Sequence, residues 1–189
     1  MTAKHNQQLP TEPMTVDEYL AWAESHPGKF ELHDGFVVAM APERAGHAVM
    51  KFAVQKELER AIKKAKLDCI MLPDGMTVRV SSKTAFEPDA LVYCGPKVPK
   101  NAVEIPHPVI VVEVLSISTR KYDSTDKLEG YFRVPSIAHY MVFNPNQTRL
   151  VLHTRQTDGL ILTRIMTGGA VRLDPPDIEL DIASIFSTS

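Results

Sequence analysis

The chain has 189 residues, of which 44% are hydrophobic and 23% charged, as expected for one soluble globular domain with a sizeable core. No apolar run approaches the roughly 18 to 20 residues of a membrane-spanning helix, and the first residues lack the apolar core of a signal peptide. The net charge of −2 gives no support for nucleic-acid binding through overall charge, so any such surface must be local. We therefore expect a cytoplasmic protein without a membrane partner.

The N-terminal part is predicted to be a flexible tail followed by a short helix. Residues 1–13 are polar and contain two prolines, so we expect this tail to precede a single domain that covers residues 14–189. The run Thr15-Val-Asp-Glu18 is a capping box, in which the threonine and the glutamate each bond the other's backbone N–H. It predicts a helix from Val16 to about Ser25.

Two more helices and a series of short strands are predicted further along the chain. Apolar residues recur at helical spacing from about Gly46 to Lys66, and a second helical pattern runs from Asp123 to Arg133. Short β-branched and aromatic runs between turn signals predict strands near residues 29–33, 36–40, 69–72, 76–81, 88–93, 108–116, 138–143 and 149–154, with further short strands and a last helical turn after them. The predicted fold is an α/β or α+β domain whose mixed central β-sheet is flanked by helices.

The sequence lacks the motifs of several common classes of site. Cys69 and Cys94 have no metal-ligand spacing and lie in apolar contexts, so we expect them to be reduced, buried thiols. The sequence contains no Walker loop, no dinucleotide fingerprint and no Gly-x-Ser-x-Gly elbow around a serine.

The clearest functional signal is a glutamate inside an apolar strand. Six aliphatic residues surround Glu113 in the run from Pro108 to Ser116, with no alternation of polar and apolar positions, which is typical of a strand buried on both faces. An ionised carboxylate is expensive there unless it is paired, hydrogen-bonded or bound to a cation. A buried glutamate satisfied by an arginine or by backbone donors is the structural alternative.

Asp89 is the expected partner of Glu113. It begins another predicted strand, 24 residues before Glu113, and a hairpin-like connection would make the two strands neighbours. Two convergent carboxylates repel each other in a poorly hydrated place, and a hard divalent cation removes that conflict. Mg²⁺ takes one or two protein carboxylates and keeps its other positions for water and phosphate oxygens. The pair therefore indicates a site that can polarise a phosphodiester and activate water.

These motifs resemble the PD-(D/E)xK nuclease superfamily and, more closely, the Uma-two family of bacterial restriction-type endonucleases. The matching pieces run in family order from about residue 14 to residue 150. They are Phe30-Glu-Leu-His-Asp-Gly35, His47, Pro88-Asp89, Val112-Glu-Val-Leu-Ser-Ile-Ser-Thr119, Asp123 with Lys127, Tyr131 and His139-Tyr140. The resemblance implies a restriction-endonuclease-like core and metal-dependent phosphodiester hydrolysis.

The resemblance also implies roles for individual residues. Asp89 and Glu113 would be metal ligands, with the carbonyl of Val114 as a third. The superfamily's lysine two residues after the glutamate is absent, because Leu115 stands there. In this family a lysine from the following helix is thought to substitute, which points to Lys127. Its ammonium would orient the attacking water and stabilise charge on the phosphate. The alternative for Lys127 is an exposed helical pair with Asp123.

Three further side chains are candidates with an open alternative each. Glu31 faces away from its apolar neighbours, so it points either to solvent or to the metal as an auxiliary ligand. His47, just inside a helix start, is either a capping or packed histidine or a contact to phosphate. Ser116 either caps the turn into the next helix or contacts the substrate.

The sequence thus predicts a Mg²⁺-dependent endonuclease that acts on DNA, with Mn²⁺ as a substitute. A homodimer is plausible, because cutting both strands often uses two sites. The alternative of another class is a non-catalytic scaffold that binds DNA or a protein partner, which Leu115 and the net charge favour. A metal-dependent phosphoesterase for small substrates is a third interpretation. The position of Lys127 distinguishes the first two.

Overall fold

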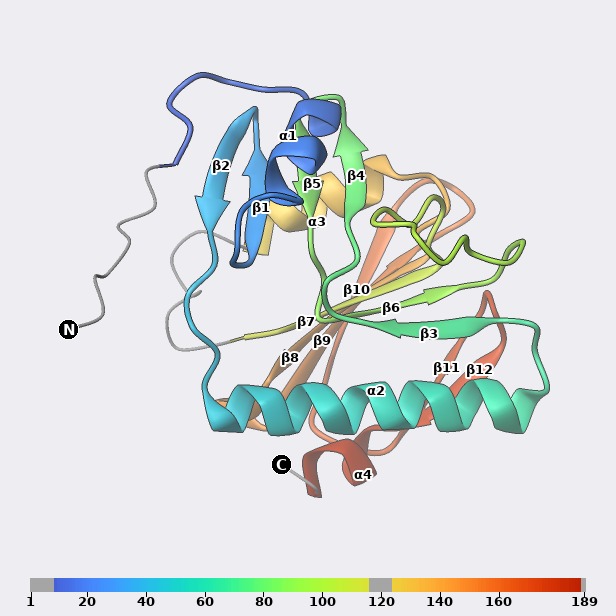
Figure 1. Ribbon diagram of the computed structural model, residues 1–189. Helices are drawn as coiled ribbons and strands as arrows, with labels where there is room; N and C mark the ends of the chain where they lie inside the picture. The colour runs from blue at the N-terminus through green and yellow to red at the C-terminus, as the bar shows by residue number, and fades with distance from the viewer. Residues whose placement is uncertain (1–8, 116–123, 188–189) are drawn as a thin grey trace.

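A six-stranded sheet forms the centre of the protein in the computed structural model, which describes residues 9–115 and 124–187 (Figure 1). The strand order is β10-β9-β8-β7-β6-β3; β7 and β8 are parallel, and the other neighbours are antiparallel. The strands are β3 (Ile70–Pro73), β6 (Ala90–Tyr93), β7 (Ile110–Val114), β8 (His139–Asn144), β9 (Arg149–Arg155) and β10 (Ile161–Met166). β7 lies in the middle of the sheet, which accounts for its unbroken apolar sequence.

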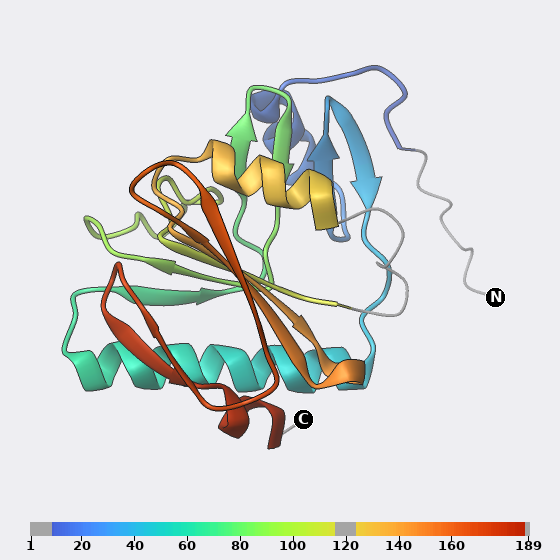
Figure 2. The ribbon, with the colours of Figure 1, turned by 180° about the vertical axis from the view of Figure 1, so that it is seen from behind.

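Helix α2 (Ala45–Ala65) crosses one face of this sheet (Figures 1 and 2). Met50, Val54 and Leu58 recur on one side of the helix and are buried against strands of the large sheet. The C-terminal segment completes the same core. It contains the hairpin β11 (Ala170–Leu173) and β12 (Ile178–Asp181) and the short helix α4 (Ile182–Ser187).

A second, four-stranded sheet has the order β2-β1-β5-β4. Its strands are β1 (Phe30–His33), β2 (Phe36–Ala39), β4 (Val78–Ser81) and β5 (Thr84–Phe86), and α1 (Val16–Ala23) packs on it. Helix α3 (Ser124–Arg133) packs against both sheets. The ring of Tyr131 lies 5.3 Å from that of Phe86 in β5 and 5.0 Å from that of Tyr140 in β8. The position of α3 therefore depends on both sheets.

The predicted fold class is confirmed, since helices flank a mixed sheet. The capping box forms, with Thr15 and Glu18 bonding each other's backbone N–H. Strand β5 is absent from the predicted elements, because its three residues are too few to give a periodic signal. A 3₁₀ turn, η2 (Pro145–Gln147), follows β8.

The prediction of two reduced, buried thiols is wrong. Cys69 and Cys94 form a disulfide and both are only partly buried. The sheet register explains the pairing. Ile70 lies opposite Tyr93 in the antiparallel pair of β3 and β6, so the residues just outside this pair, Cys69 and Cys94, also face each other.

Within residues 9–115 and 124–187, none of the helices combines the length and apolar character needed to span a bilayer. The cytoplasmic location stays a prediction, as does the division into a tail and one domain. Residues 1–8 of the predicted tail lie outside the described residues. Leu9 packs against the apolar cluster formed by α1, β1 and β2.

Candidate active site

Asp89 lies beside the C-terminal end of β7. Asp89 immediately precedes β6, whose Ala90 lies opposite Val112 of β7. The backbone N–H of Asp89 donates to the carbonyl of Val112 at 2.9 Å, and the N–H of Val114 donates to Asp89 Oδ2 at 2.7 Å. The two strands are neighbours, as predicted, and their pairing fixes the Asp89 carboxylate next to Glu113 and Val114.

Glu113 is buried in β7 and accepts two hydrogen bonds on one oxygen. Lys127 Nζ donates to Glu113 Oε1 at 3.0 Å and the Tyr131 hydroxyl donates to the same atom at 2.7 Å. Burial raises the pKa of Glu113 to about 8, and Asp89 and Glu31 add to this effect, although Lys127 and Tyr131 oppose it. The Glu113 side chain is 12% exposed, so it retains a small contact with solvent.

Lys127 extends from α3 into the space between the two sheets. Its ammonium lies 3.0 Å from Glu113 Oε1 and 3.0 Å from Glu31 Oε1, and 5.6 Å from the centre of the Phe86 ring. The side chain is only 5% exposed. Lys127 is therefore not exposed, as the alternative of an exposed helical pair requires, whereas Asp123, the other member of that pair, lies outside the described residues. The contact with Glu113 places Lys127 beside the carboxylates, and its catalytic role stays a prediction.

Glu31 is also buried, so its solvent-facing alternative is wrong. Its Oε1 accepts hydrogen bonds from Lys127 and from the backbone N–H of Glu87, at 3.0 Å each, and His33 Nε2 lies 3.0 Å from its Oε2. Burial alone would raise the pKa of Glu31. The ammonium of Lys127 and the bonds from His33 and Glu87 outweigh that effect, and the pKa lies below its ordinary value.

His47, near the start of α2, faces the end of β7. Its Nε2 lies 2.8 Å from the carbonyl oxygen of Val114 and 3.4 Å from Asp89 Oδ2, while its Nδ1 lies 2.8 Å from Glu43 Oε1. Both ring nitrogens thus face acceptors, which favours the cationic form. The bond with Asp89 is the largest cause that raises the pKa of His47 to about 9. Ser116, the other predicted substrate contact, lies outside the described residues.

Three polar residues of the site were not among the predicted ones. Lys51 Nζ lies 4.0 Å from Asp89 Oδ1 and donates to Asp74 Oδ2 at 3.0 Å, and Gln55 Nε2 donates to the Asp89 carbonyl at 2.9 Å. Lys51 and Gln55 follow His47 at intervals of four, so they share its face of α2. This spacing would identify Lys51 and Gln55 from the sequence once His47 is known to face the site. Tyr131 is read from sequence as an apolar position, because its role depends on the burial of Glu113.

The donor set fits a hard divalent cation. Asp89 and Glu113 each use one carboxylate oxygen in the hydrogen bonds above, and Asp89 Oδ1 and Glu113 Oε2 make no hydrogen bond to any described residue. Two such carboxylates beside a backbone carbonyl match the preference of Mg²⁺ for a few protein oxygens plus water. No group of three or more His, Cys, Asp and Glu side chains with metal-binding geometry occurs within residues 9–115 and 124–187. The remaining positions would therefore belong to the carbonyl of Val114, water and substrate.

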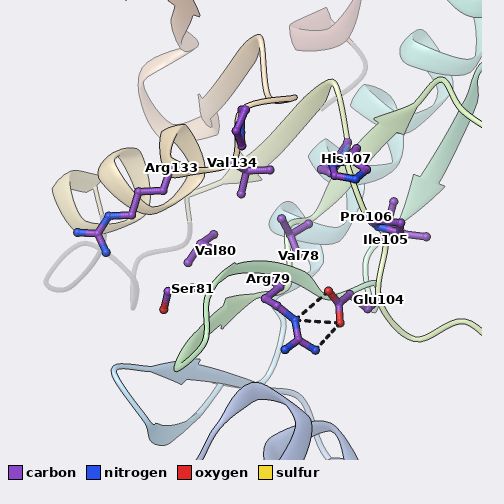
Figure 3. Close-up of a pocket in the computed structure, with 12 residues that line it drawn as sticks. Val78, Arg79, Val80, Ser81, Glu104, Ile105, Pro106, His107, Arg133 and Val134 are labelled. Carbon is purple, nitrogen blue, oxygen red and sulfur yellow. Dashed lines mark hydrogen bonds and ion pairs between the residues drawn. The ribbon is translucent and has the colours of Figure 1, made fainter.

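A shallow cavity of about 320 Å³ lies elsewhere (Figure 3). It is lined by residues 78–81, 104–108 and 133–135, and Arg79 forms an ion pair with Glu104 on its wall. Pro108 precedes β7 whereas Glu113 lies near its other end, about 16 Å away at 3.3 Å per residue. The cavity therefore contains none of the predicted site residues and is separate from the carboxylates.

Comparisons with known proteins identify relatives over most of the chain. The model of the Uma2 family, described as "Putative restriction endonuclease", matches residues 16–183. Two uncharacterised proteins of Synechocystis sp. are 27% and 26% identical, over 82% and 71% of this chain and 81% and 76% of their own lengths. A crystal structure from Anabaena variabilis, titled as a "putative nuclease belonging to DUF820", superposes with a TM-score of 0.71 at 15% identity. It covers 93% of this chain and 98% of its own.

Proposed function

Because the chain belongs to the Uma2 family of restriction-endonuclease-like proteins, we propose that it is a metal-dependent endonuclease that hydrolyses DNA phosphodiester bonds. One observation carries the proposal. Two carboxylates, Glu113 in β7 and Asp89 just before the neighbouring β6, meet at one end of β7, and the ammonium of Lys127 lies 3.0 Å from Glu113. This contact supports Lys127, which comes from α3, as the substitute for the lysine that is missing at position 115.

Each residue of the site has a distinct task in this proposal. Asp89, Glu113 and the carbonyl of Val114 would hold a Mg²⁺ or Mn²⁺ ion. When bound, the ion polarises the phosphate and lowers the pKa of a water ligand. Lys127 orients the attacking water and stabilises negative charge that develops on the phosphoryl oxygens. The water oxygen forms a bond to phosphorus, and the bond from phosphorus to the departing oxygen breaks. A proton from the water passes to the departing oxygen, which becomes the new alcohol.

His47 contributes to the same arrangement from α2. In the proposed mechanism its ring fixes the Val114 carbonyl, and its positive charge lies next to Asp89. The positive charge of His47 would also attract a phosphate oxygen of DNA. We also propose that two copies act together when both strands are cut, because each chain carries one such set of residues.

The test is a cleavage assay on supercoiled plasmid, linear duplex and single-stranded DNA with Mg²⁺ or Mn²⁺. We expect the wild-type protein to cleave at least one substrate, and Glu113→Gln and Lys127→Met to lose most of this activity while remaining folded. Glu129→Gln is the matched control, because Glu129 lies two residues from Lys127 on α3 with 66% of its side chain exposed.

Two other results would contradict the proposal. Binding of DNA by wild type and variants alike, without cleavage, would favour a non-catalytic scaffold, which the net charge of −2 does not exclude. Hydrolysis of a small phosphodiester such as bis(p-nitrophenyl) phosphate, without any cleavage of DNA, would favour a phosphoesterase for small substrates.

A further inference from the structure

The buried carboxylates of the site fall into two kinds. Both oxygens of Glu31 are engaged within the protein, since Oε1 accepts from Lys127 and from the N–H of Glu87, and Oε2 faces His33 Nε2. By contrast, Asp89 and Glu113 each keep one oxygen without a hydrogen bond to the described part of the chain. A carboxylate with three protein donors has little capacity left for a cation, whereas one with a free oxygen keeps that capacity.

Glu31 is fixed more firmly than a side chain on a loop would be. It lies in β1, which is paired with β2 on one side and β5 on the other. Phe30 and Leu32 are buried in the apolar cluster under α1, so Glu31 and His33 share the opposite face of the strand. The backbone N–H of Glu87, which donates to Glu31, lies in the segment just after β5. Glu31 is thus held by the small sheet itself.

Lys127 is the opposite case, because a lysine has a long and flexible side chain. Ordering it costs conformational entropy, so an ammonium contacted by only one carboxylate would sample several positions. A second carboxylate on the other side restricts it. In the structure, Lys127 Nζ lies 3.0 Å from both Glu31 and Glu113, and the Phe86 ring is 5.6 Å away.

We propose that Glu31 is a positioning residue for Lys127 rather than a metal ligand, and that His33 and the Glu87 N–H orient Glu31 for this purpose. The proposal rests on the proposed function, because it concerns the group that orients the attacking water. Catalysis is sensitive to such placement, since even a small displacement of a positioned group lowers the rate strongly.

The first part of the test measures metal binding and needs no catalytic activity. Removing Glu31 alone also changes the charge of the site, so the informative variant is Glu31→Gln/Lys127→Met, which removes one negative and one positive charge. We expect this double variant to bind Mn²⁺ in calorimetry with an affinity within about threefold of wild type, because the net charge of the site is unchanged and neither residue is a proposed ligand. Glu113→Gln should lose at least about tenfold, because a ligand is removed.

The second part is a double-mutant cycle on cleavage. Glu31→Gln should lower kcat with little change in KM for DNA, and Lys127→Met should lower it further. Adding Glu31→Gln to Lys127→Met should cause no additional loss, since the group that Glu31 positions is already absent. A merely structural role for Glu31 would lower the rate in both backgrounds. If the single variant Glu31→Gln does not fold, comparing the double variant with Lys127→Met still tests the positioning role. The double variant removes the buried pair as a whole, so it leaves no unpaired buried charge.

The outcomes separate this proposal from the proposed function. Loss of Mn²⁺ binding in the double variant, or a further loss of cleavage when Glu31→Gln is added to Lys127→Met, would overturn the positioning role while leaving the nuclease intact. Wild-type protein that binds no Mn²⁺ even with duplex DNA present would contradict the proposed function, and this proposal with it.

Discussion

At the scale of single residues, the site is defined by charged side chains that are buried together. Glu113, Glu31 and Lys127 are all nearly inaccessible. Within the described residues, Glu113 accepts from Lys127 and Tyr131, and Glu31 contacts Lys127, His33 and the N–H of Glu87. In such surroundings the charge state of Glu113 depends on what lies next to it. Its raised pKa makes a measurable difference to the stability of the protein.

We expect the metal-free protein to lose stability as pH rises between about 4.5 and 8. The pKa of Glu113 is about 8 in the folded protein but near 4.5 when unfolded, so the folded state binds more protons in this window. The free energy of unfolding must then fall as pH rises. His47, raised from 6.5 to about 9, contributes in the same direction above its unfolded value.

Urea unfolding at several pH values between about 5 and 8 measures this slope. The variant Glu113→Gln should have a shallower slope than wild type, because the glutamine does not titrate, while the contribution of His47 persists. Equal slopes for the two proteins would show that Glu113 is ionised throughout this range.

At the scale of elements, helix α3 determines whether Lys127 and Tyr131 reach Glu113. The helix approaches the small sheet closely at Gly130, where an added Cβ would lie 2.6 Å from a carbon of the Phe86 ring. Phe86 is itself buried, so neither side can yield without a shift. The absence of a side chain at position 130 therefore sets the distance between α3 and β5.

The substitution Gly130→Ala should destabilise the protein, because overpacking costs about 1 to 3 kcal/mol. The higher helix propensity of alanine offsets about 1 kcal/mol of this cost. It should also reduce cleavage, because α3 carries Lys127. The matched control is Gly46→Ala in α2, where an added Cβ meets nothing within 4 Å. Denaturant unfolding of both variants is the measurement, and equal stabilities would contradict this account of α3.

The sequence predicts elements better than it predicts how they meet. Helix α2 and the strands around Asp89 and Glu113 follow from periodicity and turn signals, and a hairpin-like connection permits those two strands to be neighbours. The contact of His47 with Val114 joins residues 67 positions apart, through the packing of α2 on the sheet. No local pattern encodes that contact, so the sequence leaves the role of His47 open.

At the scale of the whole molecule, the site lies where two sheets and two helices converge. Glu31 comes from the small sheet, Asp89 and Glu113 from the large one, Lys127 from α3 and His47 from α2. Glu31 and Lys127 could be nominated from the sequence only through the family resemblance, because their meeting depends on how α3 packs between the sheets. The disulfide could not be predicted either, since it follows from the register of β3 against β6.

The disulfide between Cys69 and Cys94 should stabilise the whole fold. A bridge with a sequence separation of 25 residues restricts the unfolded chain, and this loss of chain entropy is worth about 3.5 kcal/mol. We expect a lower urea midpoint after reduction, and a similar loss in Cys69→Ser/Cys94→Ser. Labelling the unfolded, unreduced protein with a thiol reagent provides the control, and two labelled cysteines would show that the bridge does not form in solution.

The most direct measurement is a calorimetric titration of Mn²⁺ and Mg²⁺ into wild type, Asp89→Asn, Glu113→Gln and the control Glu129→Gln, each checked for folding and repeated with duplex DNA present. The account predicts binding by wild type and Glu129→Gln, and a loss of at least about tenfold in affinity when either Asp89 or Glu113 is changed. Equal affinities in all four proteins, or binding by none of them even with DNA, would contradict the proposal that these two carboxylates hold a catalytic metal ion.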